Sequence, residues 1–359
     1  MKIICIFINT NMWRNNLFPA LALIVNLCLG GCRSKADNGM YVDLAASVKS
    51  GNVRQFDLTQ LGSFEHRLSV DEETQPFIFY SFVGLDERSV IILDWETVAR
   101  VSLEDGSILA RYARRGRGPL EYTRVRSCRY LEDTVYVRSN EKIIACTLDG
   151  QGIREMPVRA TDNITILPGG HFFRFNATSF EEDVHLFDVL DETGTVLRES
   201  AIIAPTVGET AIAHLNGARF YDGAWYVQPA FTDQIWRISE TEDEPWITIN
   251  YGPYRMPSEY LSSLEAMDAF ADSYITSETW HLIGKYFFFR YYRGEYHFCV
   301  FDLESGKLVF HSKSEKRDDA GIPFAYQGQK VLLWPVFSDQ YHIIFRGDAP
   351  DDLWLFSRK

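Results

Sequence analysis

The stretch Val98-Ala99-Arg100-Val101-Ser102-Leu103, followed by Glu104-Asp105-Gly106, decides the fold of this chain. Apolar and polar residues alternate along its first part, as they do in a strand that buries one face. An acidic residue followed by glycine after such a strand is a strong signal for a hairpin turn. The stretch therefore predicts two antiparallel strands that are joined near Gly106.

The same pattern recurs along the chain. Its first three turn glycines, Gly106, Gly150 and Gly194, stand 44 residues apart. The strands of the other copies are residues 143–148, 184–190, 235–238, 298–303 and 353–357. A period of about 40–50 residues is typical of propeller blades with four strands each. Six copies predict an all-β, six-bladed β-propeller of four-stranded blades.

Two features complete the predicted ring. The last copy leaves its blade short of an outer strand, and we expect residues 56–58 or 64–70 to supply it. Such closure by an N-terminal strand would remove an exposed sheet edge. The long interval before Glu304 holds a proline and then apolar residues at helical spacing. This predicts a short helical insertion near residues 257–272.

The N-terminal segment has the pattern of a secretory signal. The apolar run of residues 17–29 leads into Gly30-Gly31-Cys32, and a cysteine after small residues marks the cut point of a bacterial lipoprotein. The run is about half as long as the roughly 20 residues that must span a bilayer. We therefore expect a lipoprotein signal peptide at 1–31, lipidation at Cys32, a flexible tether at 32–52 and the propeller at 53–359.

The expected location is the cell envelope, where a lipid would anchor the chain in the outer membrane facing the periplasm. Arg33-Ser34-Lys35-Ala36-Asp37 lacks the run of acids that resembles a surface-export signal, but surface exposure stays open. A plain cleaved signal is the alternative to lipidation. Translation can start at Met1 or at Met12.

Composition excludes several classes of function. Removing residues 1–31 takes away Lys2 and Arg14 and no acid, so the formal charge changes from −13 to −15. Such an acidic chain repels nucleic acid, and no nucleic-acid partner is expected. After Cys32 three cysteines remain, in apolar contexts, which favours buried thiols over a disulfide framework. The cysteine and histidine spacing fits no zinc site, and no metal or cofactor is expected.

The segment Arg114-Arg115-Gly116-Arg117-Gly118-Pro119-Leu120-Glu121-Tyr122 lies between the first two copies. Together with residues 103–108 and the lipoprotein start, it closely resembles the six-bladed β-propeller lipoproteins of Bacteroidota, which carry Gly-x-Gly-Pro-Gly-Glu-Tyr/Phe after the first blade. Residues 231–236 and 251–252 also resemble that family. The resemblance implies the fold and the compartment, but no reaction. Leu120 replaces the third glycine, so we expect no left-handed residue at that position.

The connectors of a four-stranded meander alternate between the two faces of the ring. If the acidic turns join third and fourth strands, the links between blades lie on the opposite face, together with the connectors between second and third strands. Loops on a rigid scaffold often carry recognition. The predicted ligand-face residues on that mouth are Asp94, Glu96, Arg114, Arg115, Arg117, Glu121, Tyr122, Asn140, Asp233 and Gln234.

Two interpretations of this segment remain open. Its arginines could bind an anionic ligand, or they could lock neighbouring loops through Glu121 and Asp94. The tryptophans leave a similar choice, because they could form sugar platforms or fill the wedges between blades. These are Trp95, Trp225, Trp236, Trp246, Trp280, Trp334 and Trp354.

Together these patterns predict a non-catalytic extracytoplasmic lipoprotein that binds a glycan, a peptide or a protein partner at one mouth of the ring. No catalytic residue is assigned, because a carboxylate pair for glycoside hydrolysis cannot be picked from 49 acids by sequence alone. Two alternatives are a polysaccharide hydrolase or lyase and a structural accessory subunit of an outer-membrane complex.

Overall fold

A computed structural model shows the arrangement of the chain. It describes residues 40–50, 55–70, 81–94, 96–158, 163–167, 170–176, 184–203, 206–207, 210–211, 215–221, 224–229, 232–257, 260, 269–347 and 352–359. Met40–Lys359 form one compact unit. The predicted signal peptide and the lipidation site lie outside the described residues. No helix within the described ranges has the length and apolar character needed to cross a bilayer.

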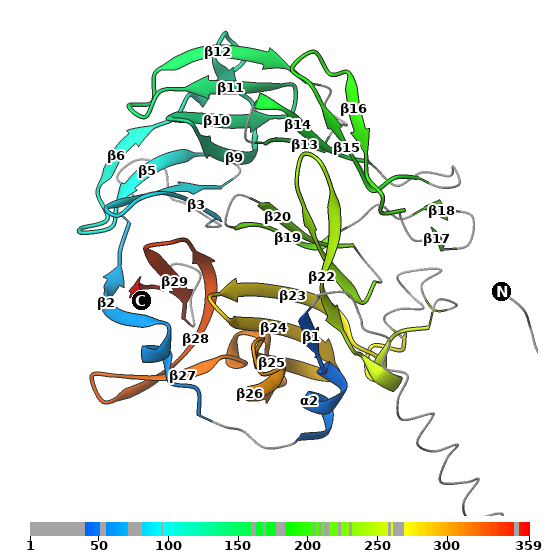
Figure 1. Ribbon diagram of the computed structural model, residues 1–359. Coiled ribbons are helices and arrows are strands. Elements are labelled where there is room, and N and C mark those ends of the chain that lie inside the picture. The colour runs from blue at the N-terminus through cyan, green and yellow to red at the C-terminus, as the bar shows by residue number, and fades with distance from the viewer. Residues whose placement is uncertain are drawn as a thin grey trace, which may run out of the picture. The chain divides into compact units, whose positions relative to one another are not determined.

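The fold is an all-β, six-bladed β-propeller, as predicted (Figure 1). Five blades are meanders whose strands follow one another in chain order. Blade one holds β3 (Ser81–Asp86), β4 (Ser89–Leu93), β5 (Val98–Ser102) and β6 (Ile108–Arg111), and blade two holds β9 (Val125–Leu131), β10 (Thr134–Ser139), β11 (Lys142–Cys146) and β12 (Gly152–Pro157). Blade three holds β13 (Asn163–Ile166), β14 (Phe172–Phe175), β15 (Phe187–Leu190) and β16 (Val196–Glu199). Blade four holds β19 (Leu215–Tyr221), β20 (Ala224–Pro229), β21 (Gln234–Ile238) and β22 (Asp243–Ile249), and blade five holds β23 (Thr276–Ile283), β24 (Tyr286–Arg293), β25 (Glu295–Asp302) and β26 (Lys307–Ser314).

Blade six combines both ends of the propeller. It contains β28 (Gln329–Ser338), β29 (His342–Arg346), β30 (Leu353–Arg358) and, at its outer edge, β2 (Gly62–Leu68). The first half of β28 pairs with an additional strand, β27 (Ile322–Tyr326), and its second half pairs with β29, where the register shifts between Pro335 and Phe337. The second half of β28 therefore serves as the inner strand of this blade.

The core lies in the wedges between blades. Val90 and Ile92 of β4 pack with residues of blade six, whereas Ile91 and Leu93 of the same strand pack with residues of blade two. All five residues of β4 are buried. Outer strands differ, since β12 is mostly exposed. Alternate residues of such a strand therefore pack into different wedges, one on each face of the blade.

An N-terminal strand closes the ring, as predicted. β2 pairs antiparallel with β30, and this matches the expectation for residues 64–70. Phe64 of β2 packs against Tyr326, Trp354 and Phe356 with ring centroids 5.4–5.6 Å apart. The alternative segment, residues 56–58, supplies no strand, because Asp57 caps a short 3₁₀ helix at Leu58–Gln60.

The predicted tether ends earlier than expected. β1 (Met40–Val42) adds a parallel fifth strand to blade four beside β22, and the helix α2 (Leu44–Ser50) follows it. Val42 and Leu44 are fully buried between blades four and five, so this short apolar segment has a place in the core. The tether remains a prediction for residues 32–39, outside the described residues.

Most of the predicted helical insertion also falls outside the described residues. Its flanks lie between β22 and β23, and the rings of Tyr260 and Phe270 stack there with centroids 4.0 Å apart. Short 3₁₀ turns occur at Gly252–Tyr254 and Arg317–Asp319.

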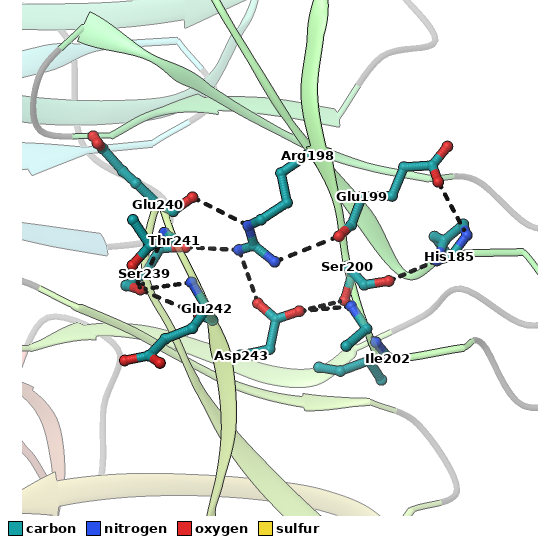
Figure 2. A network of polar contacts seen from close by, with 11 residues as sticks. His185, Arg198, Glu199, Ser200, Ile202, Ser239, Glu240, Thr241, Glu242 and Asp243 are labelled. Carbon is teal, nitrogen blue, oxygen red and sulfur yellow. Dashed lines mark hydrogen bonds and ion pairs between the residues drawn. The ribbon is translucent and has the colours of Figure 1, made fainter.

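A buried ion pair fastens blade three to blade four (Figure 2). Arg198 of β16 donates to the Asp243 carboxylate at 2.9 Å and to the carbonyls of Ser239 and Glu240 at 2.8 and 3.1 Å. The Asp243 side chain is fully buried and also accepts from the Ser200 hydroxyl at 3.1 Å. One guanidinium therefore holds the β21–β22 turn against the outer strand of blade three.

We expect Arg198→Met to lower the free energy of unfolding by about 3 kcal/mol or more, because it leaves the buried Asp243 carboxylate without its cation. The matched control is Arg237→Met, in the β21–β22 hairpin that also carries Asp243. Its ion pair with Glu244 is 2.7 Å long but exposed at 37% and 49%, so its loss should cost less than about 1 kcal/mol. Urea denaturation of both variants measures the difference, and equal losses would contradict a special role for the buried pair.

Candidate functional site

The order of the strands determines on which face of the ring the predicted mouth lies. The acidic turns join third to fourth strands in the described blades, as at β5–β6, β11–β12 and β25–β26. Residues 94–97 connect β4 to β5, and residues 112–124 link blade one to blade two. In an antiparallel meander these connectors share the opposite face.

Four predicted residues form a contact cluster between blades one and two. The Asp94 carboxylate accepts from the backbone N–H groups of Glu96 and Thr97, both at 2.7 Å. The Glu96 carboxylate accepts from Arg115 at 2.8 Å, and the Glu96 carbonyl accepts from the Tyr122 hydroxyl at 2.7 Å. These contacts tie the link between the blades to the β4–β5 connector.

Glu121 organises the glycine-rich segment. Its carboxylate accepts from the Gly118 N–H at 2.8 Å and lies 3.7 Å from Arg114. β7 (Arg114–Arg115) and β8 (Glu121–Tyr122) pair in parallel on either side of the loop. A Cβ atom at Gly116 would lie 2.0 Å from Glu121 Oε2, so any larger residue there would force the Glu121 carboxylate out of its present position.

The expectation that this loop contains no left-handed residue at Leu120 is wrong. Leu120 has a φ of +54°, although a side chain usually disfavours that region. Its N–H donates to the Glu155 carboxylate at 3.0 Å, and its side chain packs where Gly152 has no Cβ. Tertiary contacts therefore hold a conformation that glycine adopts more readily.

The remaining predicted residues are dispersed. Asn140 of blade two accepts from Arg126 at 2.6 Å, and Arg117 is exposed. Asp233 and Gln234 lie at the β20–β21 connection of blade four, where Asp233 pairs with Arg255 at 3.3 Å. The structure thus gathers the residues of blades one and two, and places those of blade four elsewhere. Their role in ligand binding stays a prediction.

The structure reveals a second site, a central channel of about 980 Å³. Residues of the inner strands β3, β9, β19, β23 and β28 line it, together with the β28–β29 connector at residues 339–341. This connector joins a first strand to a second strand, so it lies on the face opposite the predicted mouth. The channel is therefore built from the scaffold itself.

Charge distinguishes this channel from the acidic chain around it. Its described lining has one carboxylate side chain, Asp339, whose Oδ1 accepts from the N–H groups of Tyr341 and His342 at 2.8 and 2.7 Å. Four arginines line the same space, namely Arg129, Arg219, Arg346 and Arg358. Lys359 also lines it. The described channel wall thus carries an excess of positive side chains.

Tryptophans stack on several of these guanidinium groups. Arg129 lies 3.9 Å from the centre of the Trp225 ring, and Arg346 lies 5.8 Å from the Trp334 ring. The buried Arg290 covers Trp334 as well, at 4.0 Å. Such stacking fixes the plane of a guanidinium, whose N–H groups donate within that plane.

His281, which is neutral, also lines the channel beside the arginines. Arg219 Nη2 lies 3.3 Å from His281 Nε2. Burial, followed by the charges of Arg219 and Arg290, holds the pKa of His281 well below its usual value, so the imidazole accepts this hydrogen bond. Burial also lowers the pKa values of Arg219 and Arg129 to about 10, and both remain charged at neutral pH.

No metal-binding constellation occurs in the described ranges, where no three His, Cys, Asp or Glu side chains converge. Cys128, Cys146 and Cys299 are free and buried there. Burial raises the pKa of Cys128 to about 12 and that of Cys146 to about 11, which keeps both thiols protonated. This agrees with the expectation of inert thiols.

Comparison with known proteins places the fold. Residues 83–323 match the model of the family described as 6-bladed beta-propeller, DUF5128. None of the curated proteins matches the chain. Three similar solved structures are an exported protein from Bacteroides fragilis, BamB from Moraxella catarrhalis and a protein of unknown function from Bacteroides caccae.

The first of these has a TM-score of 0.60 at 12% identity and covers 89% of this chain and 98% of its own. BamB has a TM-score of 0.42 at 12% identity, with coverage of 83% and 100%. The Bacteroides caccae protein has a TM-score of 0.40 at 10% identity, with coverage of 71% and 93%. The likeness to the Bacteroides fragilis protein is a likeness of fold.

The geometry of the blade link predicts that Gly116→Ala lowers the free energy of unfolding by about 1–3 kcal/mol, because the new methyl group displaces Glu121 from the Gly118 N–H. In a Glu121→Ala background the same substitution should cost much less. A double-mutant cycle by urea denaturation measures this coupling. Equal costs in both backgrounds would show that Glu121 is not the reason for glycine at this position.

Proposed function

The chain belongs to the DUF5128 family of 6-bladed beta-propellers, and we propose that it is a non-catalytic, extracytoplasmic lipoprotein that binds a glycan or a peptide segment in its central channel. The observation that carries this proposal is the channel of about 980 Å³ between the inner strands. Its volume is at the upper end of small-molecule sites and is too small for a folded partner.

A binding role is favoured over hydrolysis by the composition of the channel wall. Glycoside hydrolysis ordinarily uses two carboxyl groups on either side of the scissile bond. The described lining supplies Asp339 alone, and the Oδ1 atom of that group is held by backbone N–H groups of its own turn. Trp334 and the arginines of the described wall suit recognition, since aromatic faces and arginine planes can contact a ligand without chemical change.

The proposed compartment is the outer membrane, with the propeller facing the periplasm. The sequence before Cys32 supports export and lipid attachment. The similar solved structure from Bacteroides fragilis is described as an exported protein, which supports the extracytoplasmic part of this proposal.

Binding in the channel predicts that a bulky side chain placed there abolishes it. The assay measures the melting temperature of the chain with a panel of neutral oligosaccharides, acidic oligosaccharides and short peptides. We expect at least one panel member to raise the melting temperature of the unaltered chain. Ser81→Trp, at the start of β3, should abolish that rise. Ser305→Trp, on the exposed β25–β26 turn, is the control and should respond like the unaltered chain.

A panel member that binds both variants equally would place the site outside the channel. If no panel member raises the melting temperature of the unaltered chain in a saturable way, the proposed binding role is wrong for these ligand classes. Release of shorter products from an oligosaccharide would instead establish a hydrolase or lyase.

Anchoring depends on the sulfur of Cys32, to which the lipid would be attached. Cys32→Ala is expected to move the chain from the membrane pellet to the soluble extracytoplasmic fraction, as measured by fractionation and immunoblotting. Cys28→Ala, within the predicted signal peptide, is the control and should leave the chain in the pellet. Membrane association of both variants would show that the lipoprotein interpretation is wrong.

A further inference from the structure

Two buried histidines lie against each other in the outer half of blade five. His297 of β25 and His311 of β26 are only 4% and 3% exposed, and the Nδ1 atom of the first lies 3.0 Å from the Nε2 atom of the second. Their rings are nearly parallel, with centroids 5.3 Å apart. Tyr291 of β24 also stacks on His297, with centroids 4.6 Å apart. Contacts between these rings therefore join the last three strands of the blade.

The histidine pair faces the wedge between blades four and five. Tyr291 stands opposite His297 in the strand register. Cys299 stands opposite His311. Opposite residues of paired strands share one face of a sheet. Both Tyr291 and Cys299 belong to the buried cluster that also contains Val42 of β1, and α2, which follows β1, lies against β26. The pair therefore lies where the N-terminal segment packs on blade five.

The charged groups around the pair neutralise each other. Glu295 of β25 and Lys313 of β26 both act on the two histidines, with opposite effects on their pKa values. These two side chains form an ion pair of 2.5 Å. Tyr291 and Cys299 are the titratable side chains opposite the pair in β24 and β25, and Lys49 of α2 is exposed. A carboxylate that already has a cation offers little to a newly charged imidazole.

One proton fits between the two facing nitrogen atoms. In a neutral pair one imidazole donates and the other accepts. A second proton would set two N–H groups against each other and place two positive charges in a buried site. We propose that the His297–His311 pair is an acid-sensitive latch, which holds β26 on blade five at neutral pH and releases it on acidification. β26 is the last strand in its sheet, so it can leave while β23, β24 and β25 stay paired.

The pKa shifts give the sign and the pH window of this latch. Burial, followed by the charge of His311, lowers the pKa of His297 to about 4, and burial also lowers the pKa of His311. In a released strand both pKa values return to about 6.5. The stabilisation is therefore complete above pH 6.5 and is lost as the pH falls towards 4. His281, which is also buried and neutral, adds to the loss in the same window, so a variant of the pair is needed to separate the two effects.

The test compares the full unaltered chain with the double variant His297→Gln, His311→Gln, whose amides can share one hydrogen bond but do not titrate. Urea denaturation at pH 7 and pH 5 measures the equilibrium constant of unfolding, in a range where ordinary carboxylates stay ionised. Between these pH values the constant should rise at least tenfold more for the unaltered chain than for the variant. Phe310→Leu is the matched control, because Phe310 is buried beside His311 and does not titrate. It should raise the constant by the same factor at both pH values.

Hydrogen–deuterium exchange of the unaltered chain shows which strand is released. Between pH 7 and pH 5, the protection factors of amides in β26 should fall at least fivefold more than those in β11, which contains no histidine. Equal losses in the two strands would overturn the latch, as would the same pH dependence of unfolding in the unaltered chain and the double variant. If the double variant does not fold, the exchange measurement decides alone. The inference goes beyond the proposed function, and its failure would leave ligand binding in the channel unaffected.

Discussion

Packing between neighbouring blades is the interaction on which the rest of this structure depends. A middle strand such as β4 buries both of its faces, one against blade six and the other against blade two. A single blade would therefore expose two apolar faces to water, and it gains stability only between two neighbours. Each wedge thus depends on the next, and the arrangement is complete only when the last blade meets the first.

The N-terminal strands serve this requirement at sheet edges. β2 covers the outer edge of β30, and its Phe64 enters a cluster of aromatic rings that also contains Tyr326 and Trp354. β1 covers the edge of β22 in blade four. Both strands pair backbone groups that would otherwise be open to another chain. Closure therefore joins the start of the propeller sequence to its end, and blade six has no complete form without β2.

Local sequence signals were sufficient to predict the blades, but they were insufficient to predict which residues line the channel. The turns at Gly106 and its repeats carry a local signal, an acidic residue followed by a glycine with positive φ, so the period, the strand order and the ring could be predicted. Leu120 could not, because its left-handed conformation is imposed by Glu155 and by the space above Gly152, both in the next blade. Val42 likewise finds its partners in blades four and five.

The channel arginines escaped prediction for a related reason. Whether the side chain of Arg129 or Arg219 points into the channel depends on the register of an inner strand. A register shift of one residue would point the same side chain into the core between two blades. A desolvated guanidinium is costly to bury, and apolar side chains of similar volume can often replace buried ionic groups without loss of stability. This chain instead has arginines at several channel positions and stacks them on tryptophans. Stability alone does not require such a wall.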